Sequence, residues 1–281
     1  MPGSVDLVYV TGASGFLGRR VCKALASDHV RVVAVSRRPL ALPNSAVVPD
    51  YAQLKPELPS ALVHLAEPAS IPGAAAADPS KATGGTLDAL LAHDWSAVVY
   101  ASSAAVYGDA DEWPHTEDED CAPTGAYARA KLDNEAAVRK RAGTALRFSN
   151  IIGVPAKPQT VLSAILDQLG GHDPVALRSL APLRDFVCVD DAAQAVVAAL
   201  AGPPGVYNIA SGEAVSIGEL ARHLLALAGQ PDRPLTAQTP DVERSVLRVS
   251  IDAAKAQLGW VPQISLEDCL RGLLNAQKGS P

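Results

Sequence analysis

The stretch that decides the fold lies near the start of the chain and reads Thr11-Gly12-Ala13-Ser14-Gly15-Phe16-Leu17-Gly18. It follows Val5–Val10, an apolar run that is typical of a buried strand, and it precedes Arg19–Ser27, which has the pattern of a helix. A glycine-rich turn between a strand and a helix is typical of a dinucleotide-binding site. A tight turn without any ligand is the alternative, and the position between strand and helix disfavours it.

Each glycine of this turn has a separate expected task. Gly12 would allow the tight bend, Gly15 would let the backbone approach a pyrophosphate, and Gly18 would let the helix pack closely on the strand. The N–H groups and the dipole at the start of the helix favour a bound anion. The turn therefore predicts the phosphate-binding part of a dinucleotide site.

Strand-like runs alternate with helix-like segments up to residue 150. The further strands are expected at Val30–Ser36, Ala61–Ala66, Ser96–Ser102 and Thr144–Phe148, and the helices between them at Thr83–Ala92 and Ala126–Arg141. The stretch Leu40–Pro59 is poorly patterned and is expected to form loops. Alternation of strands and helices implies right-handed crossovers and a sheet covered by helices on both faces. The predicted fold class is α/β, a doubly wound parallel sheet of the Rossmann type.

The pattern changes after residue 150. The elements expected there are a helix at Thr160–Leu169, a strand at Asp185–Val189, a helix at Asp190–Ala201 and a strand at Gly205–Ile209. Two more helices are expected to begin at capping pairs, Ser216 with Glu219 and Ser265 with Asp268. We predict a dinucleotide-binding domain over residues 1–150, to which residues 184–201 return. A smaller, interleaved substrate-binding lobe is predicted over residues 151–281.

Composition excludes several classes of protein. The 281 residues are 48% hydrophobic and 19% charged, which is typical of a soluble globular protein. The formal net charge of −6 disfavours nucleic acid as a partner. No apolar run approaches the roughly 20 residues that span a membrane. The scattered cysteines (Cys22, Cys121, Cys188 and Cys269) predict free thiols and no metal site, and without a secretory leader the expected location is the cytoplasm.

A pair of residues with acid–base chemistry stands in the segment Ala126–Arg141. Tyr127 and Lys131 are four residues apart, so a helix places both on one face. A nearby ammonium group favours the anionic form of a phenol, so the pair would give or take a proton at a carbonyl or carbinol oxygen. The pattern is common by itself and becomes specific only beside a dinucleotide turn and a hydroxyl donor. Ser102 and Ser103, at the carboxyl end of a predicted core strand, offer that donor, and Ser103 would hold the reacting oxygen. Capping of the strand end is the alternative role for both serines.

Together these residues resemble the extended short-chain dehydrogenase/reductase superfamily, in its nucleotide-sugar epimerase/dehydratase branch. The resemblance covers nearly the whole chain. Its motifs, in chain order, are Thr11–Gly18, His64–Ala66, Ser102–Gly108, Tyr127 with Lys131, Leu146–Asn150, Arg184–Val187, Val189–Asp191, Tyr207–Gly212 and Leu258–Trp260.

The resemblance implies a site made by residues from most of the chain. The expected catalytic residues are Ser103, Tyr127 and Lys131. The expected cofactor-binding residues are Gly12, Ser14, Gly15, Phe16, Leu17, Gly18, Ser36, Arg37, Arg38, Asp50, Leu65, Ala66, Ser102, Tyr127 and Lys131. The expected substrate-binding residues are Ser103, Asn150, Arg184 and Arg244, with the arginines neutralising a diphosphate. The alternative for Arg184 is an ion pair with Asp185 or Asp190. A homodimer is also expected from the resemblance, through the helix that carries Tyr127.

The chain departs from the family pattern at the end of its second strand. Relatives that use NAD place an acidic residue at the position of Ser36, where it binds the ribose 2′-hydroxyl. Here Arg37 and Arg38 follow instead, and both would favour a 2′-phosphate. NADP(H) is therefore predicted over NAD(H). The alternative is that both arginines stack on adenine or point to solvent.

A second departure concerns the reaction. Sugar 4,6-dehydratases of the family carry an Asp-Glu pair where this chain has Ala104 and Ala105, and methyl groups do no acid–base work. Ala82 also stands where relatives often have Asn. The leading hypothesis is NADPH-linked reduction of a keto-sugar nucleotide, and a nucleotide-sugar 4-epimerase with tightly bound NAD is the alternative. Reduction of a non-sugar carbonyl and a non-catalytic dinucleotide-binding protein are minor alternatives. The acidic stretch Asp109–Cys121 is interpreted as an exposed surface loop, not as a binding site.

Overall fold

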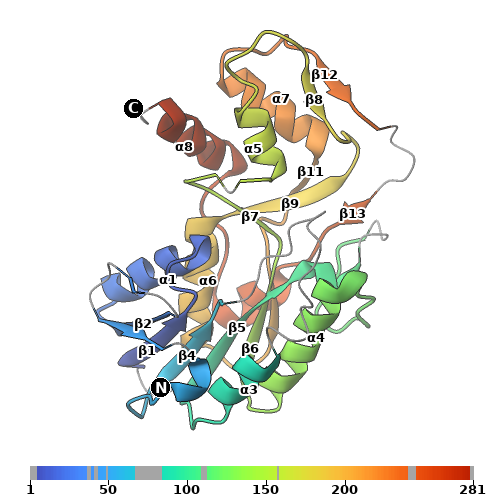
Figure 1. The fold of residues 1–281 in the computed structure, drawn as a ribbon. Helices are drawn as coiled ribbons and strands as arrows, with labels where there is room; N and C mark the ends of the chain where they lie inside the picture. The colour runs from blue at the N-terminus through green and yellow to red at the C-terminus, as the bar shows by residue number, and fades with distance from the viewer. Residues whose placement is uncertain are drawn as a thin grey trace.

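The architecture is dominated by a seven-stranded parallel sheet with the order β10-β6-β5-β4-β1-β2-β3. The structure is a computed structural model that describes residues 5–36, 39–40, 44–48, 50–66, 84–108, 113–156, 158–239 and 245–278. The strands are β1 (Leu7–Thr11), β2 (Arg31–Ser36), β3 (Ser45–Val47), β4 (Ala61–His64), β5 (Ala97–Ser103), β6 (Thr144–Phe148) and β10 (Val206–Ile209). The predicted α/β class with a doubly wound parallel sheet is confirmed (Figure 1).

Helices cover both faces of this sheet. They are α1 (Phe16–Ser27) with α6 (Val189–Ala201) on one face, and α3 (Gly84–Leu91) with α4 (Gly125–Arg139) on the other (Figure 1). Alternate residues of β1 enter the two cores: Val8 and Val10 pack with α1 and α6, while Leu7 and Tyr9 pack with α3. Both sides of the strand are therefore buried, which explains why its sequence is a continuous apolar run.

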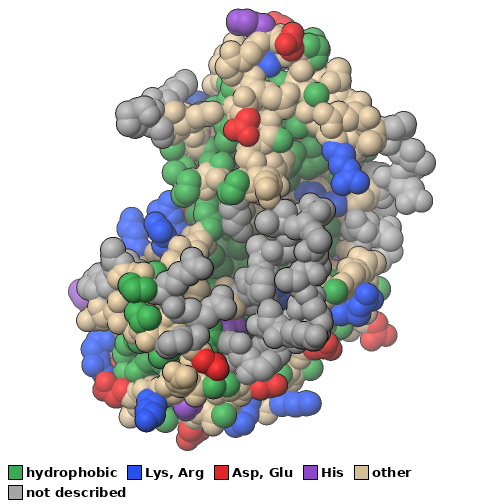
Figure 2. Space-filling view, viewed as in Figure 1, with side chains coloured by type: hydrophobic (Ala, Val, Ile, Leu, Met, Phe, Trp, Pro, Cys, Tyr) green, Lys and Arg blue, Asp and Glu red, His purple; other side chains and the backbone are tan. Residues whose placement is uncertain are grey.

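A smaller part of the molecule lies beyond the carboxyl edge of the sheet and appears at the top of Figure 1. A four-stranded sheet consists of β7 (Asn150–Ile152), β9 (Leu183–Cys188), β11 (Ala214–Ser216) and β13 (Val246–Leu247), and β8 (Val175–Leu177) pairs with β12 (Leu235–Ala237). The helices here are α5 (Val161–Leu166), α7 (Ile217–Leu227) and α8 (Leu266–Lys278), which share a separate hydrophobic core. On the lower part of the face shown in Figure 2, acidic and basic side chains of the described residues are interspersed.

The predicted helix caps are confirmed in detail. Ser216 Oγ accepts a hydrogen bond from Glu219 N at 3.1 Å, and the Glu219 carboxylate accepts one from Ser216 N at 2.8 Å. At α8, Ser265 Oγ accepts from Asp268 N at 3.1 Å and donates to the Asp268 carboxylate at 2.6 Å. Two helices of the smaller part therefore begin where their local sequence directs them to begin.

Several predicted boundaries differ from the structure. Helix α1 begins at Phe16 instead of Arg19, because the extended backbone of Gly15 (φ −73°, ψ 175°) ends the turn directly before Phe16. The stretch Leu40–Pro59 contains strand β3 and a 3₁₀ turn, η1 (Tyr51–Gln53). The strand expected at Gly205–Ile209 forms the edge of the main sheet as β10. None of the described helices has both the length and the apolar character needed to cross a bilayer.

Candidate active site at the carboxyl edge of the sheet

The glycine-rich turn has a backbone that only glycine accommodates at two positions. Gly12 has φ +69°, and a Cβ there would lie 2.9 Å from backbone atoms of Leu65 and Ala66. A Cβ on Gly18 would lie 2.1 Å from the Gly12 carbonyl oxygen. Helix α1 therefore packs directly against the turn, as the spacing of the glycines predicts.

The amino end of α1 suits an anionic group. Gly15 provides no side-chain cap, and the first turn of the helix contains no acidic residue. Arg19 Nε donates to the Ser14 carbonyl oxygen at 3.0 Å, which holds a guanidinium beside the turn. Phe16 and Leu17 follow in the first turn of the helix, where Leu17 packs against the core. Backbone N–H groups, a nearby cation and the lack of a Cβ fit the pyrophosphate of a dinucleotide.

Three other predicted cofactor residues, Ser36, Leu65 and Ala66, lie at the carboxyl ends of β2 and β4. Ser36 ends β2, and Leu65, which donates its N–H to the Thr11 carbonyl at 3.3 Å, follows β4 together with Ala66. Asp50 caps η1 by accepting a hydrogen bond from Ala52 N at 3.0 Å. Arg37, Arg38 and Ala82 lie outside the described residues.

Helix α4 brings Tyr127 and Lys131 to the carboxyl end of β5. Lys131 is 6% exposed, and its Nζ donates to the Ala101 carbonyl oxygen at 2.5 Å. The same nitrogen lies 5.6 Å from the centre of the Tyr127 ring and 4.9 Å from that of Tyr100. Tyr127 itself is half-buried. The predicted helix face is therefore present, and its lysine is anchored to the strand beside the turn.

Ser102 and Ser103 have different surroundings. Ser103 caps the 3₁₀ turn η2 (Ala104–Tyr107), because its Oγ accepts a hydrogen bond from Ala105 N at 3.2 Å. Ser102 is buried, and its hydroxyl donates to the carboxylate of Glu135 on α4. Capping, the alternative expected from the sequence, therefore describes Ser103, whose Oγ acts as an acceptor in this contact.

A buried ion pair lies behind these residues and was not predicted. The Arg147 guanidinium forms hydrogen bonds of 2.8, 3.1 and 3.2 Å with the Glu135 carboxylate, and both side chains are about 95% buried. Burial by itself would lower the pKa of Arg147, but the hydrogen bonds and charge of Glu135 raise it above its ordinary value. Arg147 Nη1 also donates to the Tyr107 hydroxyl at 2.8 Å. Burial raises the pKa of Tyr107 to about 12, although the charge of Arg147 acts in the opposite direction.

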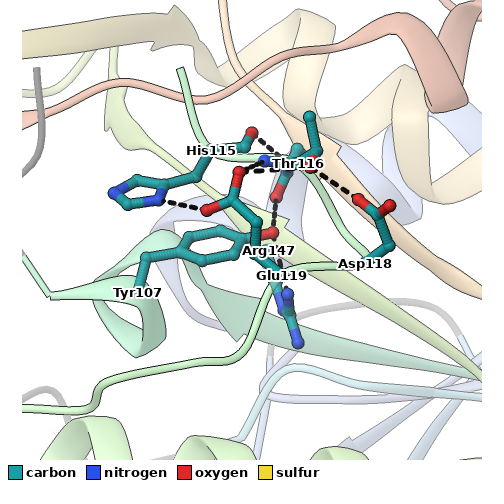
Figure 3. Close-up of polar contacts among 7 residues, drawn as sticks. Tyr107, His115, Thr116, Asp118, Glu119 and Arg147 are labelled. Carbon is teal, nitrogen blue, oxygen red and sulfur yellow. Dashed lines mark hydrogen bonds and ion pairs between the residues drawn. The ribbon is translucent and has the colours of Figure 1, made fainter. Parts of the chain in front are cut away.

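The acidic loop before α4 is only partly a surface loop (Figure 3). The His115 ring stacks on Tyr107 at 4.7 Å, and its Nδ1 lies 2.8 Å from Glu119 Oε2. The hydrogen bond with His115 lowers the pKa of Glu119. Glu117 accepts a hydrogen bond from Asn208 N at 2.7 Å, and burial raises the pKa of its carboxyl group. The interpretation as a solvated loop is therefore wrong for His115 and Glu117, which are fixed against the end of β10.

Two of the residues predicted to contact substrate, Asn150 and Arg184, lie in the four-stranded sheet. Asn150 Nδ2 donates to the Asp185 carbonyl oxygen at 3.0 Å. Arg184 donates to the carbonyl oxygens of Leu183 and Ser245 at 2.8 and 2.9 Å, and to Ser245 Oγ at 2.5 Å. Arg244 lies outside the described residues.

No structural role was predicted from the sequence for Asp185. Its carboxylate accepts hydrogen bonds from the backbone of Ser211 at 2.6 Å and of Gly212 at 2.8 Å, and burial raises its pKa. The contacts join β9 to the segment after β10. The sequence signal for Arg147 is a single charged residue inside the otherwise uncharged strand β6, whereas Glu135 stands among several charged residues of α4 and has no such signal.

Comparison with known proteins identifies the family. Residues 8–210 match the sequence profile of the NAD dependent epimerase/dehydratase family. The chain belongs to this family. The resemblance to extended short-chain dehydrogenases/reductases is thereby confirmed, and the matched relatives include epimerases and reductases.

The relatives include epimerases, reductases and a dehydrogenase. The UDP-glucose 4-epimerase of Corynebacterium glutamicum is 30% identical over 202 residues, which are 63% of this chain and only 61% of that protein. The GDP-6-deoxy-D-mannose reductase of Pseudomonas aeruginosa is 29% identical over 95% of this chain and 96% of that protein. Among solved structures, the UDP-glucose 4-epimerase of Thermotoga maritima with UDP-glucose has a TM-score of 0.83 at 22% identity, covering 97% of this chain and 98% of the other. RMD from Pseudomonas aeruginosa complexed with NADPH has a TM-score of 0.82 at 26% identity, covering 96% and 98%.

Proposed function

We propose that this chain is an NADP(H)-linked reductase of a keto-sugar nucleotide. The observation that carries the proposal is the position of Lys131 Nζ, which lies 2.5 Å from the Ala101 carbonyl oxygen of β5 and 5.6 Å from the centre of the Tyr127 ring, with Ser103 two residues further along the same strand. Dinucleotides bind at the carboxyl edge of doubly wound sheets. Residues 1–150 with helix α6 would hold the cofactor, and the smaller part of the molecule would hold most of the substrate; of the predicted segment 184–201, α6 packs on the main sheet, whereas β9 pairs with β7, β11 and β13.

The three side chains divide the work of reducing a ketone. A bound nicotinamide would supply the hydride to the carbonyl carbon. The Ser103 hydroxyl, which already accepts from Ala105 N, would donate to the ketone oxygen and so position it. The Tyr127 hydroxyl would deliver the proton to that oxygen, and Lys131 would stabilise the phenolate that remains until solvent restores the proton.

The preference for NADP(H) rests on Ser36 at the end of β2. A serine cannot repel a 2′-phosphate as the carboxylate of an NAD-specific site would, and two arginines follow it in the sequence. The full-length similarity to a GDP-6-deoxy-D-mannose reductase, and the NADPH in the structure of RMD, support the same reading. Asn150 and Arg184 would contact the sugar nucleotide, and Arg184 would pair with its diphosphate.

A 4,6-dehydratase is disfavoured by the two residues that follow Ser103. Ala104 and Ala105 occupy the first positions of η2, and Ala104 is 1% exposed. Neither side chain has a proton to give or a lone pair to accept one. We therefore propose that the chain eliminates no water from its substrate.

A 4-epimerase is the second candidate, because UDP-glucose 4-epimerases are among the relatives of this chain in both sequence and fold. Bound NAD would take up a hydride from the substrate and return it, and the same three residues would accept and give back the proton of the carbinol oxygen. Mass spectrometry of the purified protein separates the two candidates. An epimerase is expected to retain one equivalent of NAD, whereas the proposed reductase is expected to need added NADPH.

Replacement of Tyr127 by Phe tests the proposed chemistry. We expect turnover of keto-sugars linked to UDP, dTDP or GDP to fall by about 100-fold or more. The Kd for NADPH should stay within about twofold of the wild-type value. Tyr207→Phe is the matched control, since its hydroxyl bonds Pro203 O at 2.8 Å, away from the candidate site. Full turnover by Tyr127→Phe would refute the proposed role.

A further inference from the structure

We propose that Arg147 is a positioning residue for Ser103, Tyr127 and Lys131, acting through Glu135 and Tyr107. The inference rests on the proposed function, because it concerns the geometry of the same three groups. Arg147 itself lies on β6 and is 4% exposed, and its side chain bonds Glu135 and Tyr107.

The first contact of Arg147 fixes helix α4. Its guanidinium bonds the Glu135 carboxylate through Nε and Nη2, a forked arrangement that sets both distance and orientation. Glu135 lies one helical turn beyond Lys131 and two beyond Tyr127, so all three share one face of α4. Any rotation or sliding of α4 that displaced Tyr127 would therefore break the Glu135–Arg147 bonds.

The second contact of Arg147 fixes the turn that Ser103 caps. Arg147 Nη1 donates to the Tyr107 hydroxyl at 2.8 Å, and that hydroxyl donates to Asn208 Oδ1 at 2.9 Å. Tyr107 is the last residue of η2, and Ser103 caps the first turn of η2. The Arg147 guanidinium thus links helix α4, which carries Tyr127, to the turn η2, which Ser103 caps.

Strand β5 also contacts helix α4. Ser102 donates to the Glu135 carboxylate, and Lys131 donates to the carbonyl of Ala101, the residue before Ser102. Two adjacent residues of one strand therefore hold one face of α4. The loop that leads into α4 joins the same cluster, because the His115 ring stacks on Tyr107 (Figure 3).

Because the Arg147–Glu135 ion pair is buried, the loss of either partner lowers the stability of the fold. Removing one partner of a buried ion pair leaves an uncompensated charge, whereas replacing both partners with apolar residues of similar size is often neutral for stability. Stability and positioning therefore respond differently to single and double substitutions, and the difference distinguishes a positioning role from a purely structural one.

The test compares Arg147→Met, the double variant Arg147→Met/Glu135→Met, and Arg147→Lys. Arg147→Met alone is expected to lower the Tm by about 10 °C. The double variant is expected to recover the Tm to within about 3 °C of the wild type. Its kcat for the keto-sugar nucleotides is expected to stay about 10- to 100-fold below wild type. Its KM and its Kd for NADPH are expected to lie within about threefold of the wild-type values. Arg147→Lys keeps a charge but loses the fork, so it is expected to fold and to show the same loss of kcat.

Controls separate this inference from the proposed function. Glu267→Gln/Arg271→Met removes an Arg–Glu pair on α8 whose side chains are 62% and 57% exposed, and it should leave kcat and Tm unchanged. Wild-type kcat in the double variant would overturn the positioning role. If the double variant does not fold, wild-type kcat in Arg147→Lys would overturn it. Tyr127→Phe is assayed beside them: if it retains turnover, the proposed function fails, whatever the Arg147 variants do.

Discussion

Gly18 offers the sharpest test of the glycine-rich turn, through the substitution Gly18→Ala. The added Cβ would lie 2.1 Å from the Gly12 carbonyl oxygen and 2.8 Å from Ala13 Cα. The first distance is about 1.4 Å shorter than the roughly 3.5 Å at which two heavy atoms attract. Both neighbours are backbone atoms, so no side chain can rotate away, and the turn or the helix must shift.

The magnitude follows from two opposing effects. Alanine is preferred to glycine inside a helix by up to about 1 kcal/mol, whereas overpacking costs typically about 1 to 3 kcal/mol. Since the obstruction is backbone, we expect the upper end of the second range and a net loss of about 2 kcal/mol. Movement of the Gly12 carbonyl would also disturb the phosphate-binding backbone, so the Kd for NADPH should rise more than about 10-fold.

Urea denaturation followed by circular dichroism, with nicotinamide fluorescence for cofactor binding, measures both effects. Gly272→Ala is the matched control, because Gly272 lies inside helix α8 and its Cβ would meet no atom within 4 Å. That variant should gain about 0.5 to 1 kcal/mol, so the two variants should differ by about 3 kcal/mol. Equal stability of the two variants, or undiminished NADPH binding by Gly18→Ala, would refute the close packing of α1 on the turn.

Two further predictions concern the cap of α7 and the buried phenol of Tyr107. Ser216→Ala removes the acceptor for Glu219 N and should cost about 1 kcal/mol in urea denaturation, and a loss below about 0.3 kcal/mol would contradict the capping role. The folded-state pKa of Tyr107 is about 12 against an ordinary value of 10, so its neutral form is favoured by folding; the stability it contributes is present below pH 10 and is lost as the pH rises toward 12. Between pH 9 and 11 the wild type should therefore lose about 1.4 kcal/mol more than Tyr107→Phe, and parallel pH profiles of the two proteins would contradict the burial of this hydroxyl.

The sequence alone determined the elements whose signal is local. The run before Gly12, the glycine spacing and the alternation that follows predict the parallel sheet, because a strand buried on both faces must be apolar throughout and a tight strand–helix turn needs residues without Cβ. The same holds for the caps at Ser216 and Ser265, which act within one turn of their own helix. Tyr127 and Lys131 belong to this class as well, since helical periodicity alone places them on one face.

The tertiary structure decided what depends on residues far apart in the chain. Strands of two or three residues such as β7, β8 and β13 contain no periodicity to detect, and they exist because β9 and β12 supply hydrogen-bond partners. The Tyr107–Asn208 contact joins residues 101 positions apart, and the fixed position of Glu117 depends on the end of β10. Arg147 and Glu135 become partners only when β6 and α4 pack together, because a buried charge selects its counterpart by proximity in the folded chain and not by spacing in the sequence.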